Sequence, residues 1–245
     1  MNEHSTVLIL AATSDIARAI ARAFAKDGHR LLLAARDISH LEADAANLMI
    51  RYGADISLHA FDVLDAAARD RLLNSIVLPD VVICAIGALG QQQRAENDCE
   101  HAELVMRTNF EGPAQILGMF ANRFAERGHG TIVGISSVAG DRGRAANYVY
   151  GAAKAGFTAY LSGLRNRFGH SAIRVVTVKP GYVETRMTAG MKLPALLTAQ
   201  PEEVAAAVSR AVNVGSDVVY VRPLWRWIMT AIRLIPEPFF KRMHI

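Results

Sequence analysis

Short apolar runs rich in β-branched residues alternate with alanine-rich stretches of helical character along this chain. Several runs are apolar at successive positions, which is typical of strands buried on both faces of a parallel sheet. Strands are predicted at Thr6–Ala11, Arg30–Ala35, Asp55–Phe61, Asp80–Ile86, Gly130–Ser136, Ile173–Val178 and Val218–Val221. Helices are predicted near 15–27, 38–52, 65–76, 99–127, 146–169 and 201–214. This repetition predicts a doubly wound α/β fold, a parallel sheet with helices on both faces and right-handed crossovers.

Length and composition are consistent with one large core, since 51% of the 245 residues are hydrophobic. We expect a single domain over residues 1–222, followed by a C-terminal extension, 223–245. The net charge of +4 comes without a block of basic residues, which argues against a nucleic-acid partner. Two cysteines, Cys84 and Cys99, are too few for a disulfide framework, and we predict that Cys84 is a buried reduced thiol.

The expected location is the cytoplasm. The first five residues are polar and unlike a signal peptide. No apolar run approaches the ~20 residues that a helix needs to span a bilayer.

Tyr150 and Lys154 are the most informative pair of residues in the sequence. A spacing of four places both on one face of a helix, and Ser137 ends an apolar run thirteen residues before Tyr150. A neighbouring ammonium is expected to lower the tyrosine pKa by stabilising the phenolate. Ser137 would then hold a carbonyl oxygen while Tyr150 protonates it, which is the acid half of a carbonyl reduction. The same spacing also occurs on solvated helix faces, so the surrounding residues must decide.

The turn after the first predicted strand is a candidate phosphate-binding loop. Such a loop needs close backbone approach and a helix N-terminus directed at the anion. Glycine is absent here, and Ala11 is the next smallest choice, while Thr13 and Ser14 offer hydroxyl groups. Ser14 or Asp15 could cap the following helix. Taken alone, this segment is better explained as an ordinary capped strand–helix turn.

The end of the second predicted strand indicates the type of cofactor. An acidic residue at the position of Ala35 would bind a ribose 2′-hydroxyl, but that position is small and neutral, and Arg36 follows it. A guanidinium pairs well with phosphate oxygens, so Arg36 favours NADP(H) over NAD(H); the alternative is a surface arginine. Asp62, after the third strand, could accept a hydrogen bond from the adenine amino group or cap the next turn.

These residues together resemble the short-chain dehydrogenase/reductase family over nearly the whole chain. The spacing of Ser137, Tyr150 and Lys154 matches the catalytic serine, tyrosine and lysine of that family, and Asn109 falls where it has a catalytic asparagine. The resemblance implies a Rossmann-like fold of about seven strands and an NADP(H)-dependent oxidoreductase acting on C=O and CH–OH groups. It assigns no metal ligand.

The same resemblance extends to the cofactor site. Residues 179–185 resemble the P-G-x-V-x-T segment, whose threonine contacts the nicotinamide end, and Asp62-Val63 matches an adenine-contacting pair. Two departures stand out: the three glycines of the T-G-x-x-x-G-x-G motif are missing, and N-N-A-G reads Cys84-Ala85-Ile86-Gly87. The implied cofactor contacts are Ala11, Thr13, Ser14, Asp15, Ile16, Arg36, Asp62, Val63, Gly87, Tyr150, Lys154, Pro180, Val183 and Thr185.

The departures suggest a subgroup. Residues 12–17, 87–92 and 109–113 are similar to keto-sugar reductases that act with an oxidase in epimerising decaprenylphosphoryl ribose to arabinose. That resemblance implies a lipid-linked keto-sugar as substrate. The alternatives are a reductase of a small soluble ketone or acyl thioester, and a non-catalytic nucleotide-sensing relative.

The chemistry implied by the family is hydride transfer from NADPH to a carbonyl carbon. Tyr150 would donate the proton, Ser137 would polarise the oxygen, and Lys154 would lower the tyrosine pKa and hold the nicotinamide ribose. Asn109 would anchor a water that returns the proton. Family members are commonly dimers or tetramers, here through helices 99–127 and 146–169, so a homodimer or homotetramer is expected.

The last residues differ in character from the rest. The extension 223–245 holds both tryptophans and interleaves apolar residues with arginines, which suits an amphipathic segment at the inner face of a membrane. The alternative is a helix packed on the substrate pocket or on another subunit. Residues 186–200, with Met187 and Met191, suggest a mobile lid over an apolar substrate or an ordinary connecting loop.

Overall fold

A computed structural model of the chain describes residues 5–243, so most of the polar start and the last two residues lie outside the described part. One seven-stranded sheet runs in the order β3-β2-β1-β4-β5-β6-β9, and all its strand pairs are parallel. The strands are β1 (Thr6–Leu10), β2 (Arg30–Ala35), β3 (Ile56–Ala60), β4 (Val81–Cys84), β5 (His129–Ile135), β6 (Ala172–Lys179) and β9 (Val218–Tyr220). The prediction of a doubly wound parallel sheet is confirmed.

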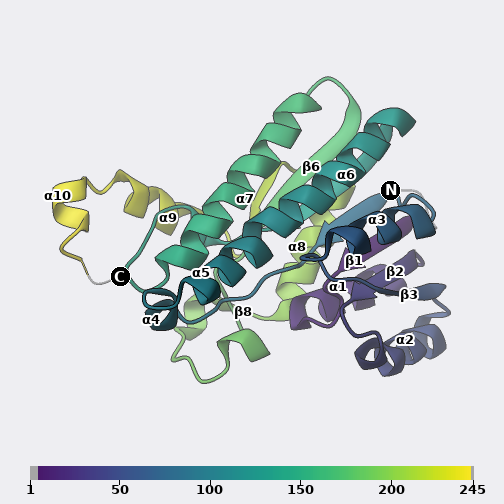
Figure 1. Cartoon of the computed structure of the whole chain (residues 1–245), viewed down its shortest axis with the longest axis horizontal. Helices are drawn as coiled ribbons and strands as arrows, with labels where there is room; N and C mark the ends of the chain where they lie inside the picture. The colour runs from purple at the N-terminus through teal and green to yellow at the C-terminus, as the bar shows by residue number, and fades with distance from the viewer. Residues whose placement is uncertain (1–4, 244–245) are drawn as a thin grey trace.

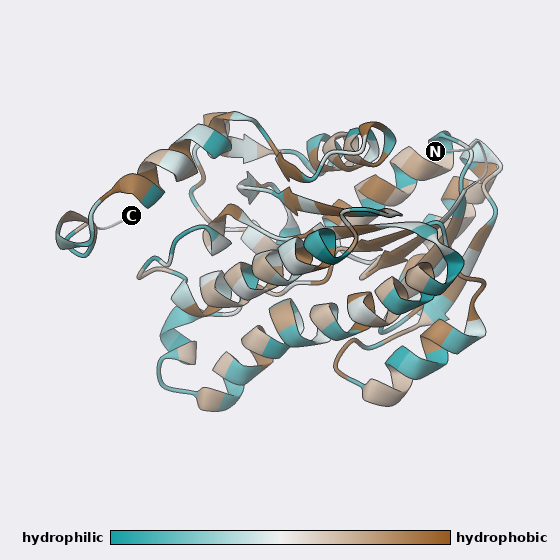
Figure 2. Cartoon of the chain, turned by 90° about the horizontal axis from the view of Figure 1, so that it is seen from above, coloured by the Kyte–Doolittle hydropathy of each residue, from teal (hydrophilic) through white to brown (hydrophobic). Residues whose placement is uncertain are grey.

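Helices cover both faces of this sheet (Figures 1 and 2). One face packs against α1 (Asp15–Lys26), α2 (Ser39–Tyr52) and α8 (Pro201–Val214). The other packs against α3 (Ala66–Ser75), α6 (Gly112–Arg127) and α7 (Tyr148–Arg167). Strands β1 and β4 are buried on both faces, which explains why their sequences are apolar at successive positions.

The predicted helix 99–127 is helical throughout, but its hydrogen bonding changes along its length. It consists of α5 (Cys99–Met106), a π-helical turn at Arg107–Glu111 and α6. Such π turns occur mostly as single-turn insertions and frequently at functional sites. The turn places Asn109 in the interior of the protein.

Several short elements were not predicted. They are α4 (Gln92–Ala95), 3₁₀ turns at Val138–Gly140, Arg186–Thr188 and Ala195–Leu197, and a small parallel sheet of β7 (Tyr182–Val183) and β8 (Thr198–Ala199). The segment 186–200, predicted as a lid or a connecting loop, therefore includes two 3₁₀ turns and one of these strands. Two-residue strands and single turns carry too little hydrophobic periodicity to be recognised in a sequence.

The chain ends in α9 (Leu224–Leu234) and α10 (Glu237–Phe240), which extend away from the body of the molecule (Figure 1). Trp225 and Met229 of α9 are buried, and the Trp225 indole packs on the backbone of Gly181. A Cβ at Gly181 would lie 2.0 Å from the indole, so only glycine permits this contact. One face of the extension therefore packs against the body of the molecule. Within residues 5–243, every helix falls short of what a membrane span requires.

Candidate active site

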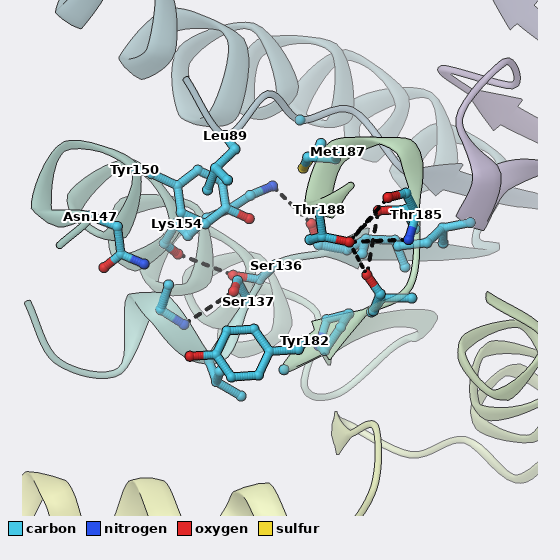
Figure 3. Close-up of a pocket in the computed structure, with 18 of the residues that line it drawn as sticks. Leu89, Ser136, Ser137, Asn147, Tyr150, Lys154, Tyr182, Thr185, Met187 and Thr188 are labelled. Atoms are coloured by element: carbon cyan, nitrogen blue, oxygen red, sulfur yellow. Dashed lines mark hydrogen bonds between the residues drawn. The ribbon is translucent and has the colours of Figure 1, made fainter. Parts of the chain in front are cut away.

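Ser137, Tyr150 and Lys154 line one cavity at the carboxyl end of β5 (Figure 3). Ser137 follows the strand, whereas Tyr150 and Lys154 lie one turn apart on α7. The cavity has a volume of about 150 Å³. The sequence prediction that these three side chains meet across a cleft is thus realised in the geometry.

Lys154 is buried, and its ammonium donates hydrogen bonds to the carbonyls of Ile86 (3.3 Å) and Ile135 (3.1 Å). Its Nζ lies 5.9 Å from the centre of the Tyr150 ring. Burial lowers the pKa of Lys154 to about 8, because desolvation disfavours the charged form.

The pKa of Tyr150 is raised in this structure, whereas the sequence led us to expect a lowered value. Burial is the main cause, since it disfavours the phenolate, and the side-chain hydrogen bond with Ser137 opposes it. The expectation was wrong because it counted the nearby ammonium and neglected desolvation. A neutral tyrosine is the form that can donate a proton.

Ser136, which we did not predict, holds α7 against β5. Its hydroxyl donates to the carbonyl of Lys154 (3.1 Å) and shares a hydrogen bond of 2.7 Å with the Thr158 hydroxyl. Gly151 also lies tightly against the turn after β5, since an added Cβ would be 2.9 Å from the carbonyl oxygen of Ala139. These contacts fix the helix that presents Tyr150 and Lys154.

Asn109 is fully buried in the π turn and is joined by its amide group to the segment after β4. The amide nitrogen donates to the carbonyls of Ala88 (2.7 Å) and Val105 (2.8 Å), and its oxygen accepts from the Ala88 N–H at 3.2 Å. Asn109 therefore holds the wall of the cavity beside Lys154. Its role as a water anchor stays a prediction.

A second cavity, of about 310 Å³, adjoins the first and shares residues 85–87 with it. The predicted cofactor residues that line it are Ala11, Thr13, Ser14, Arg36, Asp62, Val63 and Gly87. Those that line the first cavity are Ile16, Gly87, Tyr150, Lys154, Pro180, Val183 and Thr185. Thus residues scattered over 175 positions of the sequence form one continuous trough at the carboxyl ends of the strands, where ligands of such folds bind.

The loop after β1 is a capped turn that also lines this trough. Ser14 caps α1, since its hydroxyl accepts a hydrogen bond of 3.2 Å from the Ala17 N–H. Asp15, in the first turn, instead binds the backbone and side chain of Arg186. Ala11 has a φ of 62°, a conformation that glycine adopts at no steric cost. The alanine therefore adopts a left-handed backbone conformation that favours glycine.

Arg36 and Asp62 lie at neighbouring strand ends in the second cavity. The Arg36 side chain is exposed and has no hydrogen-bond or ion-pair partner among the described residues. Asp62 accepts a hydrogen bond of 2.9 Å from the Leu64 N–H, so it does cap the turn, as one of the two readings held. An unpaired guanidinium, a helix N-terminus and a long trough fit a dinucleotide that carries a 2′-phosphate.

Much of the wall of the first cavity was not predicted from the sequence. Tyr182 and Trp225 meet edge to face, with ring centres 5.4 Å apart, and the Trp225 indole donates to the carbonyl of Leu197. The other unpredicted wall residues include Leu89, Ser136, Arg144, Asn147 and Thr188. Met187 and Met191, of the predicted lid, were anticipated there, and Trp225 belongs to the helix that one of the two interpretations of the extension packed on the pocket. In the described part of the chain, no cluster of His, Cys, Asp or Glu side chains could hold a metal ion.

Comparisons with known proteins agree with this geometry. Residues 5–194 match the family model for short chain dehydrogenases. An uncharacterized oxidoreductase of Mycobacterium tuberculosis is 38% identical over 241 residues, covering 97% of this chain and 96% of the relative. The NADP-dependent 3-hydroxy acid dehydrogenase YdfG of Escherichia coli is 29% identical over 182 residues, or 72% of each chain.

Among solved structures, a short-chain dehydrogenase from Sphingobium yanoikuyae in complex with NADPH superimposes with a TM-score of 0.82. It is 25% identical, and the superposition covers 98% of this chain and 96% of that one. Family model, full-length relative and superposition lead to the same conclusion. The chain belongs to the short-chain dehydrogenase/reductase family and is an oxidoreductase of that family.

Proposed function

We propose that this protein is an NADP(H)-dependent reductase that interconverts a carbonyl group and a secondary alcohol. The observation that carries the proposal is the meeting of Ser137, Tyr150 and Lys154 in a cavity continuous with the trough that holds Arg36. The E. coli relative is named as NADP-dependent, and the Sphingobium neighbour was solved with NADPH. The unpaired Arg36 supports a preference for NADP(H) over NAD(H).

The chain's own residues supply the acid and the orientation. When bound, the reduced nicotinamide supplies the hydride that the carbonyl carbon accepts. Tyr150, neutral at physiological pH, gives its proton to the carbonyl oxygen, and Ser137 orients that oxygen by a hydrogen bond. The Lys154 ammonium lies close enough to stabilise the phenolate left behind. Hydride plus proton convert the ketone to the alcohol, and the reverse sequence oxidises it.

The remaining cofactor assignments belong to the same proposal, in which Asp15 pairs with Arg186. Ala11, Thr13, Ser14 and Ile16 would surround the diphosphate, and Asp62 with Val63 the adenine. Gly87, Pro180, Val183 and Thr185 would surround the nicotinamide. The backbone of Gly87 lies close to the catalytic groups, since a Cβ there would be 3.3 Å from Lys154 Nζ.

For the substrate, we propose an apolar or lipid-linked carbonyl compound such as a lipid-linked keto-sugar. The cavity wall beyond Tyr150 is mostly apolar and includes Leu89, Met187, Met191 and Trp225. Methionines adapt their shape to irregular ligands. A small soluble ketone or an acyl thioester is the second candidate.

A titration with NADPH and with NADH, followed by protein fluorescence, tests the cofactor assignment. Tighter binding of NADPH supports Arg36 as the residue that contacts the 2′-phosphate, and tighter binding of NADH contradicts it. Arg36→Gln should lose the preference, whereas Arg51→Gln, in the last turn of α2, should keep it. Binding of neither dinucleotide would favour the non-catalytic relative.

We also propose that the extension 223–245 contacts an anionic membrane surface. The side of α9 that faces away from Trp225 exposes Leu224, Trp227 and Leu234 at helical spacing, and Trp227 is 71% exposed. Arg226 and Arg233 flank this strip and suit anionic headgroups. Cosedimentation with vesicles tests this: wild type should bind phosphatidylglycerol vesicles, and Trp227→Ser with Leu234→Ser should not. Equal partition to pure phosphatidylcholine, or self-association instead of lipid binding, would overturn it.

A homodimer or homotetramer is the proposed assembly. The surface formed by α5, the π turn and α7 exposes Leu104, Met106, Phe110 and Tyr148, and apolar side chains of this kind are normally covered. Light scattering of wild type and Phe110→Glu tests this surface, because a charge at the centre should dissociate the oligomer.

A further inference from the structure

Arg144 is a guanidinium without a partner in the substrate cavity. Its Nε is buried and has no hydrogen-bond partner among the described residues, and no ion pair engages its side chain there. The oxygen of the Asn147 side chain is buried and unpaired in the same way. Buried polar groups of native proteins are nearly always hydrogen-bonded, so each such exception calls for an explanation.

Neighbouring residues in the same loop show that this lack of partners is not general. Arg142 donates to the carbonyls of Ile232, Arg233 and Ile235, pairs with Glu237 at 2.8 Å and stacks on the Phe240 ring. Asp141 is likewise paired, with Lys179 and with the Tyr220 hydroxyl. These residues attach the loop to the fold and to the C-terminal extension. The Arg144 side chain makes no such contact among the described residues.

The position of Arg144 is within the site already described. Arg144, Asn147 and Tyr150 all line the first cavity and also line an adjoining one, of about 190 Å³, that extends toward Gln91 and Gln92. No aspartate or glutamate of the described chain lines either cavity. Lys154, the other cation of the first cavity, is bound to backbone carbonyls. An anion entering this space therefore meets two cations without a carboxylate partner, and of these Arg144 is the one whose side chain has no hydrogen bond among the described residues.

We propose that Arg144, with Asn147, binds an anionic group on the substrate, a carboxylate or a phosphate. This inference rests on the proposed carbonyl reduction, because it places the anion on the molecule whose carbonyl faces Tyr150. A guanidinium forms two parallel hydrogen bonds to either anion, and the Asn147 amide supplies a further polar contact. The apolar wall would hold the carbon chain between carbonyl and anion. The substrate class is thus a carbonyl compound that carries a carboxylate or a phosphate group, or the corresponding alcohol.

Two matched pairs of substrates test the proposal and distinguish the two anions. The first is 4-oxopentanoate against its methyl ester, and the second is dihydroxyacetone phosphate against dihydroxyacetone. For wild type with NADPH, kcat/KM should be about 10- to 100-fold higher for at least one anion than for its neutral partner, the range expected for hydrogen bonds to a charged group. Arg144→Gln should remove this preference by lowering kcat/KM for the anion far more than for its neutral partner, while Arg51→Gln, which removes the same charge elsewhere, should keep it.

Binding of the same anions, measured by calorimetry on wild type and Arg144→Gln, separates this proposal from the proposed function. Arg144-dependent binding without turnover of any ketone would uphold the anion site and overturn carbonyl reduction. Turnover of the neutral ketones with no preference for either anion would uphold reduction and overturn the anion site. Equal loss for acid and neutral ketone in Arg144→Gln would also overturn it, since the residue would then act only on the fold.

Discussion

Arg186 and Asp15 join two loops that lie 171 positions apart in the chain. The guanidinium Nε lies 2.9 Å from one carboxylate oxygen of Asp15, and the Arg186 N–H donates to the other at 2.7 Å. The same side chain reaches the carbonyl of Thr13. The segment that follows Thr185 is thereby tied to the proposed phosphate loop.

Asp15→Asn should therefore loosen residues 186–197. The change removes the charge that holds the arginine and keeps the size of the side chain, and an exposed ion pair of this kind contributes up to about 1 kcal/mol. Tryptic cleavage after the exposed Lys192 should become several-fold faster, because the segment opens more often. Asp55→Asn, which breaks the pair with Arg30 at the far side of the molecule, is the control and should cleave at the wild-type rate. Equal cleavage rates of the two variants would show that the Asp15–Arg186 contact does not restrain residues 186–197.

Ala11→Gly should stabilise the protein. At a φ of 62° the alanine Cβ crowds the backbone, at a cost of roughly 1–2 kcal/mol. Glycine removes this strain, and the greater conformational freedom of glycine in the unfolded chain offsets only part of the gain. The net expectation is a gain of about 0.5–1 kcal/mol in the free energy of unfolding, measured in urea. Ala12→Gly is the comparison: its backbone is not left-handed, so that variant should be less stable than wild type. A loss of stability in Ala11→Gly would mean that the alanine methyl packs well enough to outweigh its strain.

The sheet and its helices could be predicted from the sequence because their signals are local and repeated. Every predicted strand exists, and the apolar runs of β1 and β4 indicated burial on both faces. The grouping of Ser137, Tyr150 and Lys154 around one cavity could be predicted, because helix geometry fixes the relation of Tyr150 to Lys154 and Ser137 follows a strand. What could not be predicted depends on contacts across long separations. Three examples are the buried pair Lys179–Asp141, the Asp15–Arg186 contact and the packing of Trp225 on Gly181. Each contact joins two segments whose local sequences do not indicate that they meet.

Lys154 should make the stability of the protein rise with pH above about 8. Its pKa is about 8 in the folded state and 10.5 in its ordinary state, so between these values the unfolded chain holds a proton that the folded protein has lost. Stability therefore increases with pH across this window, and below it the buried charge is a constant cost. Wild type should gain about 2 kcal/mol relative to Lys154→Met between pH 7 and pH 9.5. Urea unfolding at both pH values measures this, and a difference that does not change with pH would mean that the amine stays protonated in the folded state.

Tyr150→Phe should abolish carbonyl reduction and leave dinucleotide binding nearly intact. The variant keeps the ring and loses only the proton donor, so kcat should fall by about 10²–10⁴-fold, the usual contribution of a positioned acid. NADPH affinity, followed by fluorescence, should change little, because the arginine and the loops that bind the dinucleotide are elsewhere in the trough. Tyr148→Phe is the matched control, since its side chain is 45% exposed and lies outside the cavity. Full activity in Tyr150→Phe would assign the proton to another group, whereas loss of both activity and binding would show that the hydroxyl holds the cavity together instead of acting as the acid.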